Sequence, residues 1–286
     1  MNKAHVAPLV ELLDLEQIEV NIFRGRTAET GLPRVFGGQV AGQALVAAGR
    51  TVPSDRPVHS LHAYFLRPGD PTVPIVFEVD RIRDGRSFTT RRVVAIQHGE
   101  AIFHLSASFH RAEPGLEHQV PMPAAPDPET LPTFAERMAP WKDELGRRLD
   151  LLRPIDIRYV GDPPRAVQGE GAPREPRQQV WLRADGVLPD DPLVHVCAVT
   201  FASDFTLLDS VLLAHGKAWG RNQIRGASLD HAMWFHRPFR ADEWLLYDQE
   251  SATASGARGL ARGHIFSADG RLLVSVVQEG LIRVLD

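Results

Sequence analysis

The chain has 286 residues, 43% hydrophobic and 24% charged, a balance typical of a globular protein with ample material for a core and unlike that of a disordered chain. A net charge of −4 and a pI near 6.3 give none of the positive surface that nucleic-acid binding requires, so we expect no nucleic-acid partner. The single cysteine, Cys197, excludes an intramolecular disulfide, and its apolar neighbours predict a buried small side chain.

The N-terminal residues lack the features of a targeting segment. Acidic residues interrupt residues 1–19, where a signal peptide needs an unbroken apolar region, and no run elsewhere is long enough to span a bilayer. We therefore expect a cytoplasmic protein with no membrane span.

The first half of the chain predicts one buried helix followed by a set of strands. A short helix at 10–18 and a strand at 19–23 precede a helix at 39–50, whose Gly38 and Gly42 are tolerated if a sheet packs closely against them. Tight turns are expected at Asp84-Gly85 and Gly99-Glu100. Four strands are predicted, at 59–66, 74–83, 88–98 and 101–111. The two turns join the second strand to the third and the third to the fourth.

A proline-rich segment separates this set from a second one. Prolines follow one another closely from Pro114 to Pro132, and the charged residues 134–152 come next and are expected to be helical. The second half then predicts elements in the same order as the first. They are strands at 155–159 and 178–183, a helix within 191–215, and strands at 227–237, 243–253, 258–267 and 272–284.

The two halves carry a recognisable internal repeat. Residues 60–68 and 230–238 both read polar, small, aromatic, aromatic and then Arg-Pro, at a separation of about 170 residues. Farther along, Gly85 falls near Gly256 and Gly99 on Gly270, and Arg91 falls on Arg262 after one inserted residue. The repeat indicates two copies of one α+β unit, in which a helix lies along one face of a curled antiparallel sheet.

Common catalytic and cofactor motifs are missing from the sequence. It has no phosphate loop, no paired-His zinc helix, no nucleophile elbow and no paired Cys-x-x-Cys, and residues 36–38 lack dinucleotide spacing. We therefore expect no cofactor and no metal. His231 next to Asp230 is not read as a dyad, because neighbours on a strand point to opposite faces, and a structural or surface role is expected for it.

Three polar residues remain as candidates for chemistry. Gln278 occupies a position where strand alternation with Val274 and Val276 predicts an apolar residue, and a buried amide needs hydrogen-bond partners. Asp204 lies among apolar residues, as either a helix-capping or a functional carboxylate. Ser228 taken alone is an ordinary serine at the start of a strand.

Several segments together resemble the acyl-CoA thioesterase II family, whose members have a double hotdog fold. The resemblance is carried by residues 35–39, 62–68, 85–88 with Arg91, 202–204, 230–238 and 277–280. It implies that a water molecule held by an Asp, a Thr and a Gln hydrolyses fatty acyl-CoA to free fatty acid and CoA. In this sequence those residues fall on Asp204, Ser228 and Gln278, and serine keeps the hydroxyl while losing the methyl group that restrains it.

The resemblance also implies a domain organisation. We expect an N-terminal hotdog domain at 1–113, a proline-rich linker with a short helix at 114–152, and a C-terminal hotdog domain at 153–286 that carries the active site. Each unit would wrap an antiparallel sheet around a central helix, in an α+β fold. Because bare strand edges invite pairing, a homo-oligomer is expected.

A thioester carbonyl is electrophilic enough for attack by water, given a base and oriented hydrogen bonds. Asp204 is the expected base, Ser228 and Gln278 hold the water, and backbone N–H groups at a helix start stabilise the oxyanion. Arginines on the repeated strands are possible contacts for the CoA phosphates, or simply solvated side chains. They are Arg86, Arg91, Arg92, Arg258 and Arg262.

Two other functions remain open. A hotdog enoyl-CoA hydratase would place a His five residues after the Asp, where this sequence has Asp209. A non-catalytic acyl-CoA or lipid-binding module is the other alternative, since a fold alone does not establish an activity.

The repeat also predicts a single hydrolytic site, in the second copy. Gln278 falls on Ala107, Ser228 on Val58 and Asp204 near Gly38, and none of these three first-copy residues can hold or deprotonate water. If the two helices are aligned differently, Gln39 or Gln43 would take the position in the first copy.

Overall fold

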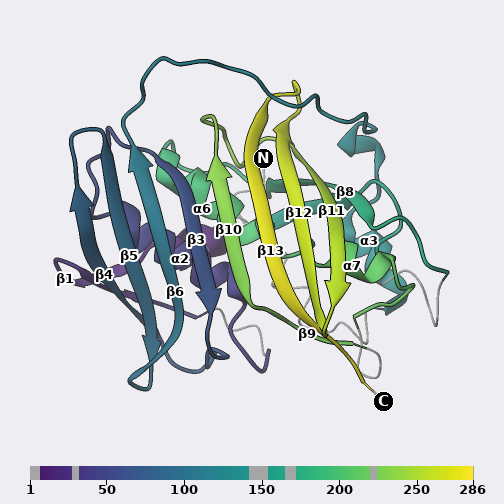
Figure 1. The fold of residues 1–286 in the computed structure, drawn as a ribbon, viewed down its shortest axis with the longest axis horizontal. Coiled ribbons are helices and arrows are strands. Elements are labelled where there is room, and N and C mark those ends of the chain that lie inside the picture. The colour runs from purple at the N-terminus through teal and green to yellow at the C-terminus, as the bar shows by residue number, and fades with distance from the viewer. Residues whose placement is uncertain (1–6, 28–31, 142–153, 165–171, 220–223, 286) are drawn as a thin grey trace.

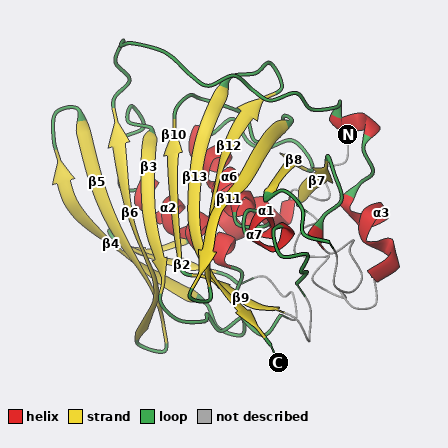
Figure 2. Cartoon of the chain, turned by 45° about the vertical axis from the view of Figure 1, so that its right-hand side comes forward, coloured by secondary structure: helices red, strands yellow, loops and turns green. Residues whose placement is uncertain are grey.

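One large antiparallel sheet of thirteen strands forms most of the computed structural model, which describes residues 7–27, 32–141, 154–164, 172–219 and 224–285. Two long helices, α2 (Gly37–Gly49) and α6 (Pro192–Ser203), lie together on one face of this sheet (Figures 1 and 2). Among the helices of the described ranges, none is long and apolar enough to cross a membrane.

The first half matches the predicted strands closely and differs at its N-terminus. Its other elements are α1 (Ala7–Leu13), β1 (Glu16–Glu19), β2 (Ile22–Gly25), β3 (Val58–Phe65), β4 (Ile75–Asp84), β5 (Phe88–Gln97) and β6 (Glu100–His110). The predicted short helix is present but ends earlier, at Leu13, and the hairpin of β1 and β2 replaces its second half and the single strand expected at 19–23. Ile18 and Val20 are half exposed, so their apolar side chains do not belong to a core-facing helix.

The β5–β6 turn lies one residue earlier than predicted. His98 and Gly99 form it, with φ of 52° and 78°, and β6 already begins at Glu100. Two consecutive residues with positive φ are the requirement of the tight hairpin turn that matches strand twist. Gly99 supplies that conformation without cost, while His98 adopts it as a non-glycine residue.

The second half repeats this arrangement. Its strands and its shorter helix are β7 (Ile155–Tyr159), β8 (Arg177–Ala184), α7 (Asp209–Leu213), β9 (Ile224–Ser228), β10 (Asp230–Phe235), β11 (Leu245–Ser255), β12 (Arg258–Ser267) and β13 (Leu272–Val284). The helix expected within 191–215 is two helices, α6 and α7, separated by a turn that begins at Asp204. The strand expected at 227–237 is likewise divided, into β9 and β10.

The strands of the two halves meet in one continuous sheet. Its order is β1-β2-β4-β5-β6-β3 for the first half, followed directly by β10-β13-β12-β11-β8-β7 for the second, and β9 pairs with β13. The halves join where β3 pairs antiparallel with β10, with Leu61 opposite Met233. Counted from this junction outward, β3-β6-β5-β4 and β10-β13-β12-β11 come in the same order (Figure 1).

Matching ion pairs occur on equivalent strands of the two halves. The Arg92 guanidinium lies 3.0 Å from the Asp80 carboxylate, and that of Arg262 lies 2.5 Å from Glu250. Each pair joins neighbouring strands, β4 to β5 and β11 to β12. Cross-strand charge pairs therefore repeat together with the strands.

The expected match of Arg91 with Arg262 is wrong by one residue. Arg91 lies opposite Ala107, whereas Ala261 lies opposite Gln278, so the counterpart of Arg91 is Ala261. A shift of one residue moves a side chain to the other face of a sheet. Arg91 is accordingly buried, with 1% of its surface exposed, while the Arg262 side chain is largely exposed.

Glycines allow the two long helices to touch. A Cβ at Gly38 would overlap Phe201 O, and one at Gly42 would stand 3.2 Å from Cys197 O. Because Gly38 lies beside the end of α6 and Gly42 beside its middle, α2 and α6 run antiparallel. The close neighbour of these glycines is thus a helix, where a sheet was expected. Cys197 is buried between them as predicted, and burial raises the pKa of its thiol, which keeps it protonated and unreactive.

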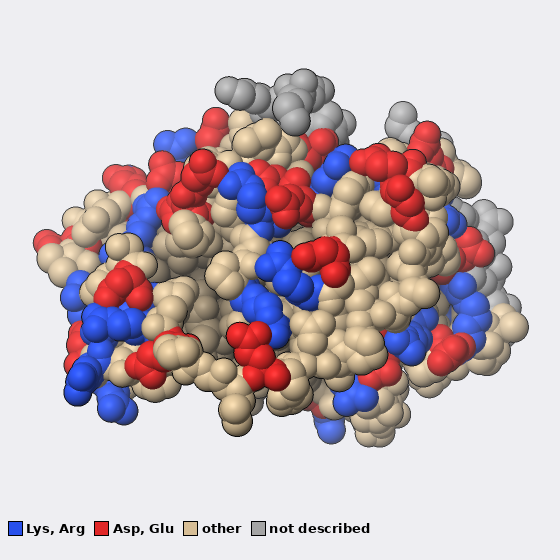
Figure 3. All heavy atoms as spheres, turned by 90° about the horizontal axis from the view of Figure 1, so that it is seen from above, with Lys and Arg blue, Asp and Glu red and all other residues tan. Residues whose placement is uncertain are grey.

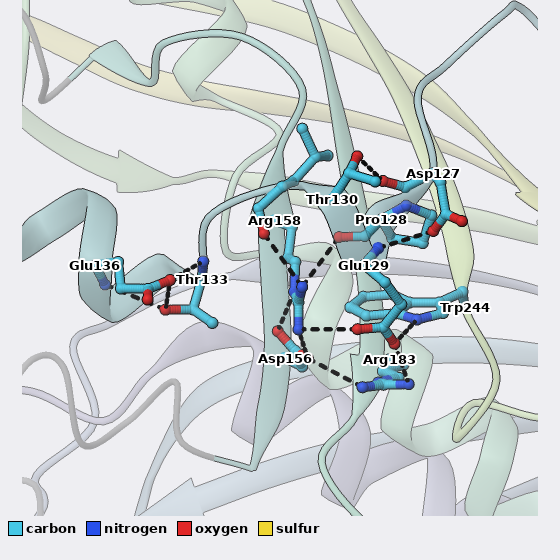
Figure 4. A network of polar contacts seen from close by, with 11 residues as sticks. Asp127, Pro128, Glu129, Thr130, Thr133, Glu136, Asp156, Arg158, Arg183 and Trp244 are labelled. Atoms are coloured by element: carbon cyan, nitrogen blue, oxygen red, sulfur yellow. Dashed lines mark hydrogen bonds and ion pairs between the residues drawn. The ribbon is translucent and has the colours of Figure 1, made fainter.

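The proline-rich segment is tied to the second half by a charged network (Figure 4). It contains two 3₁₀ turns, η1 (Pro128–Thr130) and η2 (Ala139–Trp141), and one helix, α3 (Phe134–Met138), which begins with a Thr133–Glu136 capping box. The rest of the helix expected at 134–152 lies outside the described residues. Glu129 accepts a hydrogen bond from the Trp244 indole at 3.0 Å and lies 3.2 and 3.5 Å from the Arg183 and Arg158 guanidinium groups.

The same segment covers an apolar cluster on the sheet face that points away from the helices. Trp181, Leu246 and Phe266, from β8, β11 and β12, form this cluster, and Met122 and Leu131 of the segment pack on it. The Trp181 indole N–H also donates to Pro126 O at 3.0 Å. The segment therefore crosses over to the second half and shields its outer face (Figure 1).

Positive and negative side chains are intermixed over the molecular face seen in Figure 3. No extended area of one sign covers that face, in keeping with the small net charge. A charged site on this face would therefore be a local one.

Candidate active site

Asp204 ends helix α6, where it occupies the C-cap position. Its side chain keeps some contact with solvent, yet protein atoms surround the carboxyl group closely. This burial raises the pKa of Asp204 to about 6, against the opposite effect of hydrogen bonds from Gln278, Ser228 and the Gly38 N–H and of the Arg34 charge. Asp204 is thus a carboxylate poised to exchange a proton near neutral pH.

The other two predicted residues converge on this carboxylate. Gln278, fully buried on β13, donates from Nε2 to Asp204 Oδ1 at 2.5 Å. Ser228, the last residue of β9, donates from its hydroxyl to the same oxygen at 3.0 Å. The alternation that singled out Gln278 holds, since Val274 and Val276 share its buried face. The structure therefore brings the three residues together, although they are far apart in the sequence.

The first half completes the site through the start of helix α2. The N-cap residue of α2, Phe36, makes no side-chain hydrogen bond to the first turn, and the Gly38 N–H is hydrogen-bonded to the Asp204 carboxylate instead. A Cβ on Gly37 would lie 2.7 Å from Asp204 Oδ2, so a larger residue would occupy the space beside this oxygen. The positive end of the helix dipole and its free N–H groups point to the same place.

His231 also belongs to this cluster, and the surface role considered from the sequence is wrong. The register that pairs Ala232 with Val277 places His231 across from Gln278, and its Nε2 lies 2.8 Å from Ser203 Oγ. Burial lowers the pKa of His231 to about 4, while a hydrogen bond with Gln278 acts in the other direction. The imidazole is therefore neutral at physiological pH.

A sequence signal for His231 existed. It alternates with Met233 and Phe235 on the buried face of β10, so it is a polar residue where an apolar one is expected. The pattern is the same one that singles out Gln278 on its own strand. Ser203, the other partner of the imidazole, carries no comparable signal, because a serine at a helix end is ordinary.

The candidate arginine contacts do not gather at this site. Arg92, Arg258 and Arg262 form ion pairs on the sheet surface, and Arg91 is buried against Thr51. Nothing in the described contacts brings Arg86 to Asp204.

The first half has no equivalent of this cluster. Ala107 takes the place of Gln278, as expected, because Leu61 lies opposite it just as His231 lies opposite Gln278. The residue that corresponds to Asp204 is Arg50, since each is the C-cap of its long helix, so the expected match near Gly38 is wrong.

Three further residues considered for the chemistry, Gln39, Gln43 and Asp209, make hydrogen bonds that stabilise the fold. Gln39 and Gln43 both donate to Arg26 O, at 3.1 and 2.8 Å, which ties the chain before α2 to the helix. Asp209 accepts hydrogen bonds from the Tyr159 hydroxyl at 2.9 Å and the Trp219 indole at 2.5 Å. A hydratase would need a free histidine in the place of Asp209. Across the described ranges, no group of three or more His, Cys, Asp or Glu side chains is arranged to hold a metal ion.

Comparisons with known proteins point in one direction. A family profile described as acyl-CoA thioesterase matches residues 152–281, and one described as acyl-CoA thioesterase N-terminal domain matches residues 24–110. Acyl-coenzyme A thioesterase 8 of Mus musculus is 42% identical over 96% of this chain and 89% of its own length. Acyl-CoA thioesterase 2 of Haemophilus influenzae is 41% identical over 96% of each chain.

A solved structure agrees with these matches. The chain is similar to the crystal structure of an acyl-CoA thioesterase II from Mycobacterium marinum, with a TM-score of 0.79 and 49% identity over 96% of this chain and 97% of the other. More distant structures share the fold alone, such as a hot dog fold protein from Alicyclobacillus acidocaldarius, with a TM-score of 0.75 and 20% identity.

Proposed function

Because the chain belongs to the acyl-CoA thioesterase family and hydrolyses acyl-CoA thioesters, we propose that Asp204, Ser228 and Gln278 activate the attacking water. The observation that carries this proposal is the convergence of Gln278 Nε2 and Ser228 Oγ on one oxygen of a carboxylate with a raised pKa. No covalent nucleophile is needed, since the thioester carbonyl is itself electrophilic.

In the proposed reaction a water donates one proton toward the Asp204 carboxylate. Gln278 has a second N–H on the same nitrogen and the Ser228 oxygen has free lone pairs, so the two can hold that water in place. The water oxygen attacks the thioester carbon as its proton passes to Asp204, and the first-turn N–H groups of α2 stabilise the oxyanion. The C–S bond then breaks, and Asp204 returns the proton to the CoA thiolate.

The fold is proposed to be a double hotdog, with units at 1–113 and 153–286 and a linker at 114–152. The repeated strand order about the β3–β10 junction supports this organisation. One site per chain is proposed, because the first unit has Ala107, Val58 and Arg50 at the corresponding positions. Titration with a non-hydrolysable acyl-CoA analogue would then give one site per chain.

We further propose a cytoplasmic homo-oligomer that acts on fatty acyl-CoA. Within the described residues, β1 and β7 are the end strands of the sheet and pair on one side only, which supports association between copies. A relative from Saccharomyces cerevisiae, 24% identical, is named as peroxisomal, so the compartment has to be tested by localisation of the tagged protein. Light scattering gives the oligomeric state, and a series of acyl chain lengths gives the substrate preference.

The proposed base predicts a specific pH dependence. Asp204 accepts a proton only as the carboxylate, and its pKa is raised to about 6, so kcat/KM should fall about tenfold per pH unit below pH 6 and level off above pH 7. Thiol release from an acyl-CoA, measured between pH 4.5 and 8, checks this, and circular dichroism at each pH controls for unfolding. A flat profile through pH 6 in folded enzyme would contradict the assignment.

His231 is proposed as a positioning residue for Gln278. The atoms His231 Nδ1 and Gln278 Oε1 are both buried and lack a well-formed hydrogen bond to the described residues. The single proton of the Ser203 hydroxyl can go to Thr200 O, 2.9 Å away, or to His231 Nε2, 2.8 Å away. When it goes to the imidazole, Nδ1 carries the ring proton and can donate to Gln278 Oε1. That hydrogen bond would keep the amide nitrogen of Gln278 turned toward Asp204.

Replacing this histidine should disturb the reaction through Gln278. In His231→Leu, which copies Leu61 of the first half, the Gln278 amide can turn its oxygen toward Asp204, which disfavours the carboxylate. We expect kcat to fall about tenfold with little change in KM, and the acid limb of the pH profile to move to higher pH. His231→Asn, whose amide can replace the Nδ1 donor, should restore part of the loss. An unshifted acid limb in folded His231→Leu enzyme would rule out the positioning role.

A further inference from the structure

A second concave site lies at the other end of helix α2. The helix runs from Gly37 beside Asp204 to Gly49, a length of roughly 20 Å. Beyond its end is a cavity of about 450 Å³. The cavity is lined by Arg50, Thr51, Val52, Pro53, Arg56, Arg81, Asp84, Gly85 and Arg91. Four arginines and one aspartate give this lining a net charge of +3, in a protein whose overall charge is −4.

Arg91 supplies a fixed positive charge at the base of the cavity. It is almost fully buried, and its guanidinium donates to Thr51 Oγ1, Thr51 O, Arg83 O, Thr90 O and the Asp84 carboxylate. These contacts occupy all of its N–H groups, so Arg91 acts on a ligand through its charge and not through hydrogen bonds. The contact with Thr51 O also covers a carbonyl at the negative end of α2.

Donors for a ligand come from the neighbouring arginines. The terminal nitrogens of Arg56 donate to Gly85 O, Thr89 Oγ1 and Arg86 O. Its Nε is buried without a hydrogen-bond partner, and the Asp55 carboxylate, 3.9 Å away, is bound to Arg111. Arg81 donates from Nε to Asn21 Oδ1, and its terminal nitrogens have no hydrogen bond within the described ranges. Arg50 is paired with an exposed carboxylate, that of Asp14, at 2.6 Å. The cavity lining therefore includes the free guanidinium end of Arg81 and an arginine, Arg56, whose Nε is an unpaired donor beneath the surface.

The position of this cavity corresponds to the Asp204 site. Arg50 caps α2 as Asp204 caps α6, and Arg91 occupies the place of Ala261. Where the second half has Asp204 and Ala261, the first half has the positively charged Arg50 and Arg91. The duplicated position between a helix end and the sheet thus carries the opposite charge in the first half.

We propose that this cavity is a binding site for a phosphate-bearing ligand, separate from the hydrolytic site. Guanidinium groups bind phosphate oxygens with paired, charge-assisted hydrogen bonds, and they lose less hydration than ammonium groups do. The volume lies within the range of small-molecule sites. Two sources share this chemistry, the nucleotide part of a CoA molecule and a free phosphate or nucleotide.

Calorimetry on the full-length protein tests the proposal with three probes: adenosine 3′,5′-bisphosphate, ADP and inorganic phosphate. The variants are Arg81→Gln, which removes the free guanidinium, and Arg56→Lys, which keeps the charge and removes the orphaned donor. Each should weaken binding about tenfold or more, as expected for loss of a hydrogen bond to a charged group. Arg92→Gln is the matched control, since Arg92 is exposed on the adjoining strand position and does not line the cavity.

Steady-state kinetics separates the cavity from the hydrolytic site. The expected result is weaker probe binding in Arg81→Gln with kcat and KM for acyl-CoA unchanged. Equal affinity for all three probes identifies phosphate itself as the ligand, and a preference for the bisphosphate identifies a CoA-type nucleotide. The proposal is overturned if the wild type binds no probe at about 5 mM, which is a weak limit for a specific site. It is also overturned if folded variants bind as the wild type does, or if KM rises in parallel with the probe Kd.

Discussion

Asp204→Asn is expected to lower kcat about 1,000-fold while the protein stays folded. The substitution preserves shape and lets the new carboxamide oxygen accept the hydrogen bonds from Gln278 and Ser228, while the charge and the basicity are lost. General-base catalysis contributes about 10²–10⁴-fold to enzymatic rates, which sets the expected size. Affinity for acyl-CoA should change little, because no substrate group is removed.

The raised pKa of Asp204 also predicts the effect on stability. The folded state binds a proton more tightly than the unfolded state, so the native protein loses stability as the pH rises from about 4 to about 6, and the cost remains above that range. Asparagine removes this cost. At pH 7 the variant should be as stable as the wild type or more so, by about 1–2 kcal/mol.

Thiol release measures the expected loss of kcat, and thermal unfolding of the same samples measures the expected stability of Asp204→Asn. Asp191→Asn is the control, because Asp191 caps the opposite end of α6 and asparagine caps a helix equally well. Full turnover by Asp204→Asn would remove Asp204 from the mechanism. Lost activity with a lower unfolding temperature would point to a structural role instead.

Gly38→Ala is expected to damage both the fold and the site. An added Cβ would overlap Phe201 O, a backbone atom that cannot rotate away, and the Phe36 ring. The two helices would have to separate, which costs about 1–3 kcal/mol for an overpacked core and exceeds the gain of about 1 kcal/mol in helix propensity. The same displacement moves the Gly38 N–H away from Asp204, so kcat should fall at least about tenfold.

Gly42→Ala provides a matched control on the same helix. Its Cβ would lie 3.2 Å from Cys197 O, a contact that small shifts can relieve, and the helix-propensity gain offsets that cost. Stability within about 1 kcal/mol of the wild type and normal activity are expected. If chemical denaturation showed Gly38→Ala to be no worse than Gly42→Ala, the close helix contact would not be essential.

The strands could be predicted because their signals are local or repeated. Alternation placed Gln278 on the buried face, and the motif around Arg67 and Arg237 fixed the relation between the two halves. The helices lack such anchors. The turn after Asp204 and helix α7 have no counterpart in the first half, so the repeat distance changes between the helices and the strands, and Asp204 was matched with the wrong end of α2.

Sequence patterns do not predict contacts between segments that are far apart in the chain. Nothing in the order of residues indicates that Gly38 donates to Asp204, because the contact depends on the antiparallel packing of α2 and α6. Arg91 was placed one residue out of register, and its burial became visible only when the strand pairing put it opposite Ala107.

Gly37 and Gly38, at the start of α2, restrict which substitutions the first half can accept. Under the proposed single-site mechanism, Ala107 and Val58 can stand at the positions of Gln278 and Ser228 without harm to hydrolysis, and only core packing constrains them, because both are buried. Gly37 and Gly38 are constrained by the Asp204 site of the other half as well. Small apolar substitutions at residues 58 and 107 should therefore preserve activity in folded protein, whereas substitutions at 37 and 38 should impair it, a contrast that deep mutational scanning would display directly.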